Sequence, residues 1–459
     1  MSQSLYRKYF NIVPVNNLDA FEVNGGTNQI SFLIPPLQGA ALSTRDMVFS
    51  GSLLINKDDG SAYAKTDIGT IDASFDSVNG AHNLISRIDI VSQGSGNSLI
   101  EQRRQYSLIN KYRRGVLSEN DLVAGKFASQ QLCSNSSKGA QNFLVRAAGN
   151  GATTADENAI DFAIQLNTGF LMDNIQQINL GAANGLLVKI YLNEVPNAIF
   201  NINPNAASLA NNNFNIVLKD VKLFGRYNFV TQPFLAQLSG VNFRKINDLM
   251  SVVQSSNDTI ANSPMVRSLH KMVHIYQPNT STSNNIDANN TATNQLVGLK
   301  KYIVSNNGTR HPYNYDIEIT PSVSALPSGA GNDGRVSGNA EQIYLLIGAL
   351  NSQYPPVHSL INADNQAIAH EDESGGSTAL AKAVNTQTLN VNGLGVDYSY
   401  GFSGYTVPMT QNLIQMNVES SVLTNDGIVV PAIRNQTATQ NAFIEYDAQL
   451  QYQGMMLTQ

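Results

Sequence analysis

The chain has 459 residues, of which 42% are hydrophobic and only 14% are charged, and its net charge is −6 at pH 7. This acidic balance excludes a protein whose main task is to coat nucleic acid, because that task needs a strongly basic surface. A single cysteine, Cys133, excludes an intrachain disulfide framework. No run reaches the roughly 18 apolar residues that a membrane-spanning helix needs, and the N-terminal segment lacks the apolar core of a signal peptide.

Apolar and polar residues alternate in the first half of the chain, which is the period of a half-buried β-strand. Ile30, Phe32 and Ile34 share one face of such a segment. Residues 99–114 have a mixed helical spacing that stops at Gly115, so we expect a helix there, and a short helix is expected near 168–173. The predicted strands of this half are 29–34, 47–55, 159–166, 186–193 and 214–229.

The second half has the same character, with more polar residues between its elements. Residues 340–352 predict an apolar helix and 243–254 a short one, whereas 441–457 predict a long strand with Ile444 and Tyr446 on its dry face. Asn makes up about an eighth of the chain, and Asn side chains bond their own backbone in turns. Long polar loops are expected at 134–158, 278–295, 322–339 and 362–395. Strands with one wet and one dry face are typical of antiparallel sandwiches.

The chain carries the same signal twice. A strand closes at a glycine turn in residues 90–94, and another closes in the same way in residues 303–308, about 213 residues later. Asn307-Gly308 is a strong signal for a two-residue hairpin. Each half then ends in a long strand, at 214–229 and 441–457. We therefore predict two β domains, residues 1–230 with an N-terminal arm and residues 246–459, joined by a linker at 231–245.

Several segments in this order resemble the double-jelly-roll major capsid proteins, above all those of polinton-like viruses and virophages. The matching segments are LISRIDIVSQGSGNSLIEQRRQYSLINKY (84–112), IDFAIQLNTGFLMDNIQQINLGAANGLLVKIYLNEV (160–195), FNIVLKDVKLFGRYNFV (214–230), LKKYIVSNNGTRHPYNYDI (299–317) and FIEYDAQLQYQGMML (443–457). The resemblance is one of pattern and order, not of a sharp motif, and residues 318–440 match least well. It implies an all-β fold of two tandem eight-stranded jelly-roll sandwiches with a few short helices and long polar loops.

The resemblance also implies a structural function in the capsid of a double-stranded DNA virus. Subunits of this family form homotrimeric, pseudo-hexagonal capsomers that tile an icosahedral shell, and penton and minor capsid proteins complete it. The expected location is the virion, after assembly in the host cytoplasm or nucleus. Contact with an inner membrane or the genome is a further expectation. We expect no catalytic residues, no cofactor, no metal and no small-molecule substrate.

Basic residues gather in two places that could contact a partner. Five cations lie within twelve residues, with one acid, Glu101, nearby; they could touch membrane headgroups, the genome or a minor capsid protein, or pair with acids of a neighbouring subunit. A second pair lies in the N-terminal arm, which could bind a neighbour or a membrane, or form a simple edge strand. The candidate contact residues are Arg103, Arg104, Lys111, Arg113 and Arg114, with Arg7 and Lys8 in the arm.

Other motifs suggest little chemistry. His270 and His274 have the spacing of a zinc helix but lack the glutamate of a metalloprotease and lie in a β-like run, which favours a structural or surface pair. The acidic run 370–374 and the segment 56–60 have no regular cation-ligand spacing, and Gly94-Ser-Gly96 is not a nucleophile elbow. The main alternative function is a β-rich receptor- or glycan-binding fibre or adhesin, although the chain has no Trp for sugar stacking. A jelly-roll enzyme is the third reading.

Overall fold

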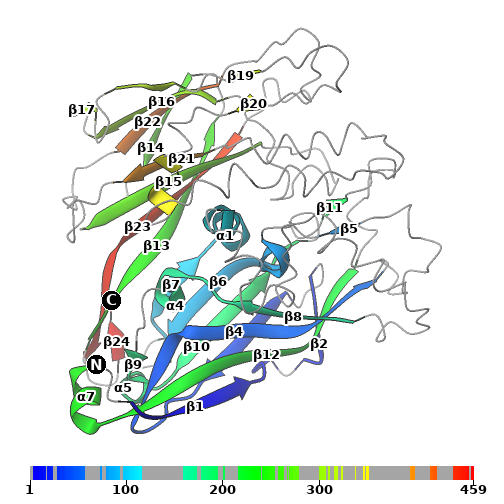
Figure 1. Ribbon diagram of the computed structural model, residues 1–459, viewed down its shortest axis with the longest axis vertical. Coiled ribbons are helices and arrows are strands. Elements are labelled where there is room, and N and C mark those ends of the chain that lie inside the picture. The colour runs from blue at the N-terminus through cyan, green and yellow to red at the C-terminus, as the bar shows by residue number, and fades with distance from the viewer. Residues whose placement is uncertain are drawn as a thin grey trace.

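The computed structural model consists of antiparallel β-strands with a few short helices (Figure 1), so the predicted all-β class is confirmed. None of the described helices is long and apolar enough to cross a membrane. The structure describes residues 4–16, 18–23, 28–56, 73–74, 79–93, 97–115, 159–172, 177–194, 200–201, 215–238, 240–253, 257–262, 266, 268–278, 299–306, 309–310, 315–318, 322–323, 336–337, 345–346, 348–350, 393–397, 414–420, 438–453 and 456–458.

Two antiparallel sheets contain most of the described strands in the first half of the chain. The larger consists, in spatial order, of β1 (Ser4–Ile12), β12 (Asn215–Val230), β4 (Ala40–Asn56) and β8 (Ile160–Gln165), with β2 (Ala20–Glu22) paired to β12 and β9 (Gln177–Ile178) paired to β4. The smaller consists of β3 (Gln29–Ile34), β10 (Leu186–Leu192), β6 (Ile85–Ser92) and β7 (Leu99–Arg103). A separate two-stranded sheet joins β5 (Ala73–Ser74) to β11 (Phe200–Asn201).

The period-two pattern predicted from the sequence gives this half its core. Every second residue of β10, from Leu186 to Leu192, is buried, while the intervening residues are partly exposed. Phe32 of the smaller sheet stacks edge-on against Phe49 of the larger sheet, with ring centroids 6.0 Å apart, and Phe49 stacks in turn on Phe162. Each fully buried side chain of this size contributes about 1.5–3 kcal/mol of transfer free energy, so these inward faces hold the two sheets together.

Two further sheets make up the second half. One consists of β13 (Gly240–Val253), β23 (Ala438–Gln453), β15 (Leu269–Pro278) and β21 (Gly393–Asp397), with β24 (Met456–Thr458) paired to β23. The other consists of β14 (Asn257–Asn262), β22 (Ile414–Ser420), β16 (Leu299–Asn306) and β17 (Thr309–Arg310), with β18 (Ile317–Glu318) paired to β16. Two short strands, β19 (Ser322–Val323) and β20 (Val336–Ser337), pair separately.

The two halves have the same strand order. Eight described strands remain in each half when the short strands β2, β5, β9 and β11 of the first half and β18, β19, β20 and β24 of the second are left out. Numbered along the chain, the first, eighth, third and sixth of these strands form one sheet, and the second, seventh, fourth and fifth form the other. Two four-stranded antiparallel sheets connected in this way have the order of a jelly roll. The repeat that the two glycine turns suggested is therefore present in the sheet topology itself. The domain limits at 230 and 246 stay a prediction; helix α7 (Gln232–Gln237) lies between β12 and β13.

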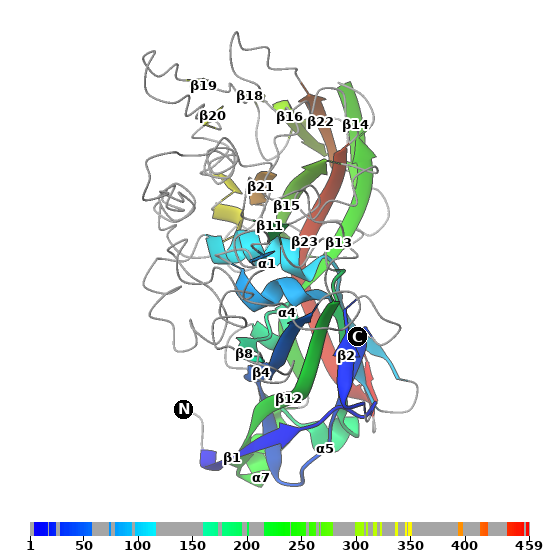
Figure 2. The same ribbon diagram turned by 90° about the vertical axis from the view of Figure 1, so that its right-hand side faces the viewer.

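Among the described residues of the first half there are four more helical segments. These are the 3-10 helix η2 (Gly80–Leu84), α1 (Tyr106–Gly115), α4 (Gly169–Met172) and α5 (Leu180–Ala183). Helix α1 lies between the two halves, against the sheet that contains the long strands β13 and β23 (Figure 1), and Figure 2 shows the same stacking of the halves from the side. The first and second sandwiches, as the two pairs of sheets are called below, therefore meet at α1.

Three predicted elements differ from the structure or extend beyond it. Residues 99–103 form strand β7 rather than the start of a helix, and Gln105, with φ +47°, separates this strand from α1. Residues 240–253 form a strand rather than a short helix, because β13 pairs with β23 over its whole length. In the predicted helix 340–352, residues 345–346 and 348–350 are helical and the others lie outside the described residues.

Candidate functional site

The predicted contact residues Arg7 and Lys8 lie on β1, at the edge of the larger first sheet. Both are exposed, and within the described ranges β1 hydrogen-bonds to β12 alone, so its other edge is open. Phe10 fixes the strand, because its ring packs directly over Gly225. A Cβ added to this glycine would lie 2.1 Å from the Cζ atom of the ring. Its outward side carries Tyr9, which is 67% exposed. This strand therefore presents both cationic and apolar side chains to solvent.

The predicted basic cluster does not form one surface patch. Arg104 is exposed and donates to Gln102 at 2.7 Å. Arg103, at the end of β7, is only 1% exposed, because residues of the second sandwich cover it. The expected surface position of this residue is therefore wrong. Arg113 lies on α1 and forms an ion pair with Glu445 of β23 at 3.3 Å. The side chains of Lys111 and Arg114 lie outside the described residues, although both residues belong to α1.

Helix α1 joins the two sandwiches through a shared apolar cluster. Leu108, Ile109 and Tyr112 on one face of the helix are each at most 5% exposed. They pack against the outward face of the sheet that contains β13, β15 and β23. The second-sandwich members of this cluster are Ile246, Val273, Ile275, Leu346, Ala349 and Phe443. The junction is thus built as a small core, and separating the sandwiches would expose it to water.

A second contact lies beside this cluster, at helix α4. The fully buried carboxylate of Glu101 accepts hydrogen bonds from the backbone amides of Gly169 at 3.0 Å and Phe170 at 2.8 Å. These bonds orient Phe170, whose ring stacks edge-on against Phe243 of β13 with centroids 5.2 Å apart. Amide bonds to a buried carboxylate are charge-assisted and stronger than neutral ones. Glu101 therefore fixes the helix that docks on the second sandwich.

Charged side chains surround the apolar part of the junction. Glu445 accepts from Arg113 at 3.3 Å and from Arg244 at 3.1 Å, so one carboxylate joins α1 to β13. Arg103 lies beside this pair, and its guanidinium carbon is 5.3 Å from the centroid of the Phe443 ring. Burial, followed by repulsion from Arg113, lowers the pKa of Arg103 to about 9. Burial also raises the pKa of Asp248 above its ordinary value.

A buried amide network supports α1 from the first sandwich. Asn79 donates to Asn83 and, at 2.9 Å, to the backbone carbonyl of Ser107, and it accepts from Asn110 at 2.6 Å. His82 of η2 meets the Tyr106 hydroxyl at 2.9 Å. A buried polar group is costly unless it is hydrogen-bonded. These bonds therefore specify where the helix begins and how it faces the second sandwich.

The remaining motifs occupy ordinary structural positions. His270 and His274 on β15 are both buried; His270 meets Asp447 at 2.7 Å and His274 meets Gln440 at 3.1 Å. No cluster of metal-ligating side chains occurs among the described residues. Asn56 ends β4, while the rest of the 56–60 segment, the Gly94-Ser-Gly96 motif, the Asn307-Gly308 pair and the acidic run 370–374 lie outside the described residues.

Sequence reasoning missed most of the junction. Glu445 looked like a solvent-facing residue of an alternating strand, and it is instead the shared ion-pair partner of two arginines. Lys271 of β15, which donates to the backbone carbonyl of Gly348 at 3.2 Å, lay between the two histidines of a motif and was given no role of its own. The one usable signal was the alternation of Glu101 and Arg103 within a short apolar strand, because charged residues at buried positions need partners nearby.

No family model and no curated protein matches the chain. Solved structures do match it, over nearly its whole length. The Faustovirus major capsid protein has a TM-score of 0.54 at 10% identity, covering 98% of this chain and 90% of the other. A chain of the Sputnik virophage structure gives 0.54 at 9%, covering 100% and 89%. Protein VP54 of the virus PBCV-1, fitted into a Sputnik reconstruction, gives 0.53 at 11%, covering 99% and 96%. These likenesses show a common fold.

Proposed function

We propose that this chain is the major capsid protein of a DNA virus or virophage, with a structural and not a catalytic role. The observation that carries the proposal is the repeated strand order in the two halves, in a fold that the Faustovirus major capsid protein matches along 98% of the chain. A fold alone does not give a function. Here, however, the complete length, the order of the strands and the pairing of two sandwiches all agree with one architectural role.

The internal repeat supports self-association as a trimer. Within the chain, the sheet of β13, β23 and β15 is covered on its outward face by α1 of the first sandwich. The corresponding sheet of the first sandwich, with β1, β12 and β4, leaves Tyr9 67% and Phe224 42% exposed. If like units meet by like contacts, a neighbouring subunit covers this face, and such head-to-tail contacts close into a ring. Three subunits would supply six sandwiches and give a pseudo-hexagonal capsomer.

The wider assembly follows from the same proposal. Capsomers would tile an icosahedral shell in the virion, with penton and minor capsid proteins as further partners. Among the predicted contact residues that the structure describes, Arg7, Lys8 and Arg104 are exposed, and we propose them as contacts for an inner membrane, the genome or a minor capsid protein. The domain division into residues 1–230 and 246–459, with a linker at 231–245, belongs to the proposal as well. The fibre or adhesin alternative gains no support from the structural matches.

The test is the oligomeric state and shape of the purified chain. Light scattering after size exclusion should give about 150 kDa, three times the 49.6 kDa of one chain, and negative-stain images should show threefold particles with a hexagonal outline. Replacing the exposed Tyr9 and Leu5 by Asp should shift the trimer towards monomer without unfolding it. Replacing Leu99, which is 45% exposed on another sheet, should have no such effect. A stable monomer of the native chain at micromolar concentration would overturn the proposal.

A further inference from the structure

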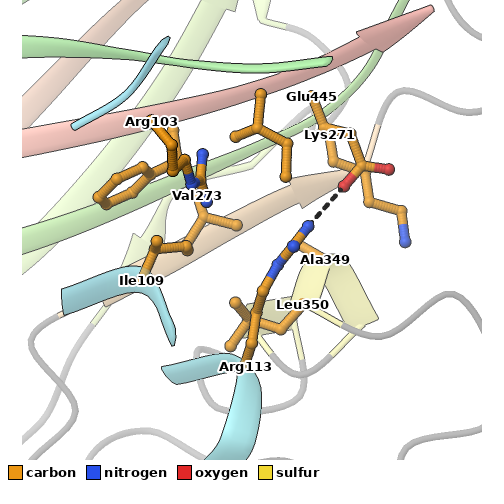
Figure 3. A pocket seen from close by; sticks show the side chains of 10 residues that line it. Arg103, Ile109, Arg113, Lys271, Val273, Ala349, Leu350 and Glu445 are labelled. Carbon is orange, nitrogen blue, oxygen red and sulfur yellow. Dashed lines mark hydrogen bonds and ion pairs between the residues drawn. The ribbon is translucent and has the colours of Figure 1, made fainter. Parts of the chain in front are cut away.

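A small pocket lies inside the junction between the two sandwiches. It is lined by α1, β7, β13, β15 and β23, and it has room for about one species the size of a water molecule. Its polar lining consists of Arg103, Arg113, Lys271 and Glu445, and apolar side chains close the rest. Figure 3 shows Arg113 reaching from α1 to Glu445, with Arg103 and Lys271 on either side. Three cations and one carboxylate therefore line one small space, and of their donors Arg113 also bonds Glu445 and Lys271 also bonds the backbone carbonyl of Gly348 at 3.2 Å.

Arg103 has hydrogen-bonding capacity that the described residues leave unused. Its side chain is 1% exposed, and its Nε and Nη1 atoms have no hydrogen-bond acceptor in the part of the chain that the structure describes. A buried donor without a partner loses its hydration, and a charged one loses more. The contact with the Phe443 ring offsets part of this cost. The Nε and Nη1 groups of Arg103 still need a hydrogen-bond acceptor.

Two of the nearby carboxylates already have partners. Glu445 is shared between Arg113 and Arg244, and Glu101 accepts from the amides of α4. Glu101, Asp248 and Glu445 favour the charged form of Arg103, yet burial and the charge of Arg113 still lower its pKa to about 9, which leaves the guanidinium protonated at neutral pH. The acids around the pocket therefore do not offset the burial of this cation.

The donors in the lining determine which species suits the pocket. Arginine and lysine side chains donate hydrogen bonds and cannot accept them. A water molecule would satisfy two of these donors but would bring two hydrogens of its own and no charge. A halide ion accepts from every side, brings a negative charge to a site with an excess of cations, and consists of one atom.

We propose that the junction pocket binds a single small inorganic anion, chloride being the simplest, held by Arg103, Arg113 and Lys271. The ion would stabilise the contact between the two sandwiches within one chain. This inference does not depend on the proposed capsid function, because every residue that carries it belongs to the same subunit. The oligomeric state could be other than trimeric and the pocket would keep the same lining.

Halide-dependent unfolding of the purified native chain tests the proposal. Bromide is raised at constant ionic strength against gluconate, which is too large for the pocket, and the urea midpoint is followed by far-UV circular dichroism. Once bromide exceeds its dissociation constant, each tenfold rise should change the unfolding equilibrium about tenfold in favour of the folded chain. Arg103→Met should remove this dependence, whereas the matched variant Arg104→Met, whose charge is exposed and outside the pocket, should keep it.

Equal bromide dependence in all three proteins, or none in the native chain, would overturn the proposal. Crystals grown in bromide give a second measurement, which decides by itself if Arg103→Met does not fold. An anomalous peak between Arg103, Arg113 and Lys271 is the expected result. Its absence, with density for a water or for a carboxylate of this chain in its place, would count against an inorganic anion.

Discussion

A single methyl group at Gly169 should disturb the contact between the two sandwiches. A Cβ added to this residue would lie 2.0 Å from the backbone carbonyl oxygen of Arg244 in β13, where ordinary contacts begin at 3.4 Å. Either α4 or β13 must therefore move by about 1.4 Å, the difference between these distances. Since the obstacle is backbone and not the end of a flexible side chain, the strain cannot be relieved by a rotamer change.

The expected cost of Gly169→Ala combines two effects. Overpacking of a fitted interior costs about 1–3 kcal/mol. A shift of α4 also weakens the two amide bonds to Glu101, and hydrogen bonds to charged groups contribute about 1.5–3 kcal/mol each. We expect a total loss of about 3 kcal/mol or more, which corresponds to a fall in Tm of roughly 6–12 °C for a unit of 150–250 residues.

The assay is thermal unfolding by far-UV circular dichroism, with Gly348→Ala as the matched control. Gly348 also lies near the junction, but a Cβ there meets nothing within 4 Å. The control should be as stable as the native chain or more stable by up to about 1 kcal/mol, because Gly348 lies in a helical segment and alanine favours a helix over glycine. If Gly169→Ala were as stable as this control, the close approach of α4 to β13 would be refuted, and with it the described packing of the junction.

Three further predictions concern other parts of the chain. Ile444→Asp buries an unpaired carboxylate at a site that is 2% exposed, so it should lower the stability of the fold by several kcal/mol and abolish the yield of soluble protein on expression. The control Gln449→Asp, at an exposed position on the same strand, should keep the native yield. A normal yield of Ile444→Asp would show that the strand register is wrong. Burial lowers the pKa of His274 from 6.5 to about 4, so the unfolded chain binds a proton at this residue more readily than the folded chain does. The contribution of His274 to stability should therefore be complete above pH 6.5 and decline by up to about 1.4 kcal/mol per pH unit as the pH falls towards 4. The difference between the urea midpoints at pH 7.5 and pH 5 should be smaller in His274→Gln than in the native chain, and an equal difference would exclude this histidine as the cause. Phe10→Ala should loosen β1 and speed tryptic cleavage after Arg7 or Lys8, because the ring that fills the space above Gly225 is lost. Leu99→Ala, at an exposed position on the other sheet of this sandwich, is the control. Unchanged cleavage in both variants would mean that Phe10 does not anchor the strand.

Alternation along single strands was enough to predict much of the first sandwich. Strands β3, β8 and β10 have the inward residues that their period-two pattern predicts, because one face is buried in the core and the other is wet. The same rule was incomplete for β23. There Phe443 and Ile444, adjacent residues that point to opposite faces, are both 2% exposed, because α1 covers the face that the sequence pattern left to solvent.

Long-range pairing explains the elements that were mispredicted. In β13, the buried residues Phe243 and Ile246 are three apart, a spacing that suggests a helical turn, but antiparallel pairing with β23 over fourteen residues outweighs this local signal. In β7, the buried carboxylate of Glu101 is satisfied by the amides of α4, and the guanidinium of Arg103 lies over the Phe443 ring of the second sandwich. Neither partner is close in sequence, so local spacing could not reveal the junction.

The amide network beneath α1 protects Asn79 from deamidation during storage. Asn79 precedes Gly80, and an Asn-Gly pair in a flexible chain loses ammonia when the backbone nitrogen of the glycine attacks the side-chain carbonyl. Here the side chain of Asn79 is held by Asn83, Ser107 and Asn110 and is fully buried, so it is not free to adopt the geometry of attack. Isoaspartate at position 79 would accumulate only in molecules whose helix α1 has come away, and peptide mapping of stored protein would then give a chemical record of that opening.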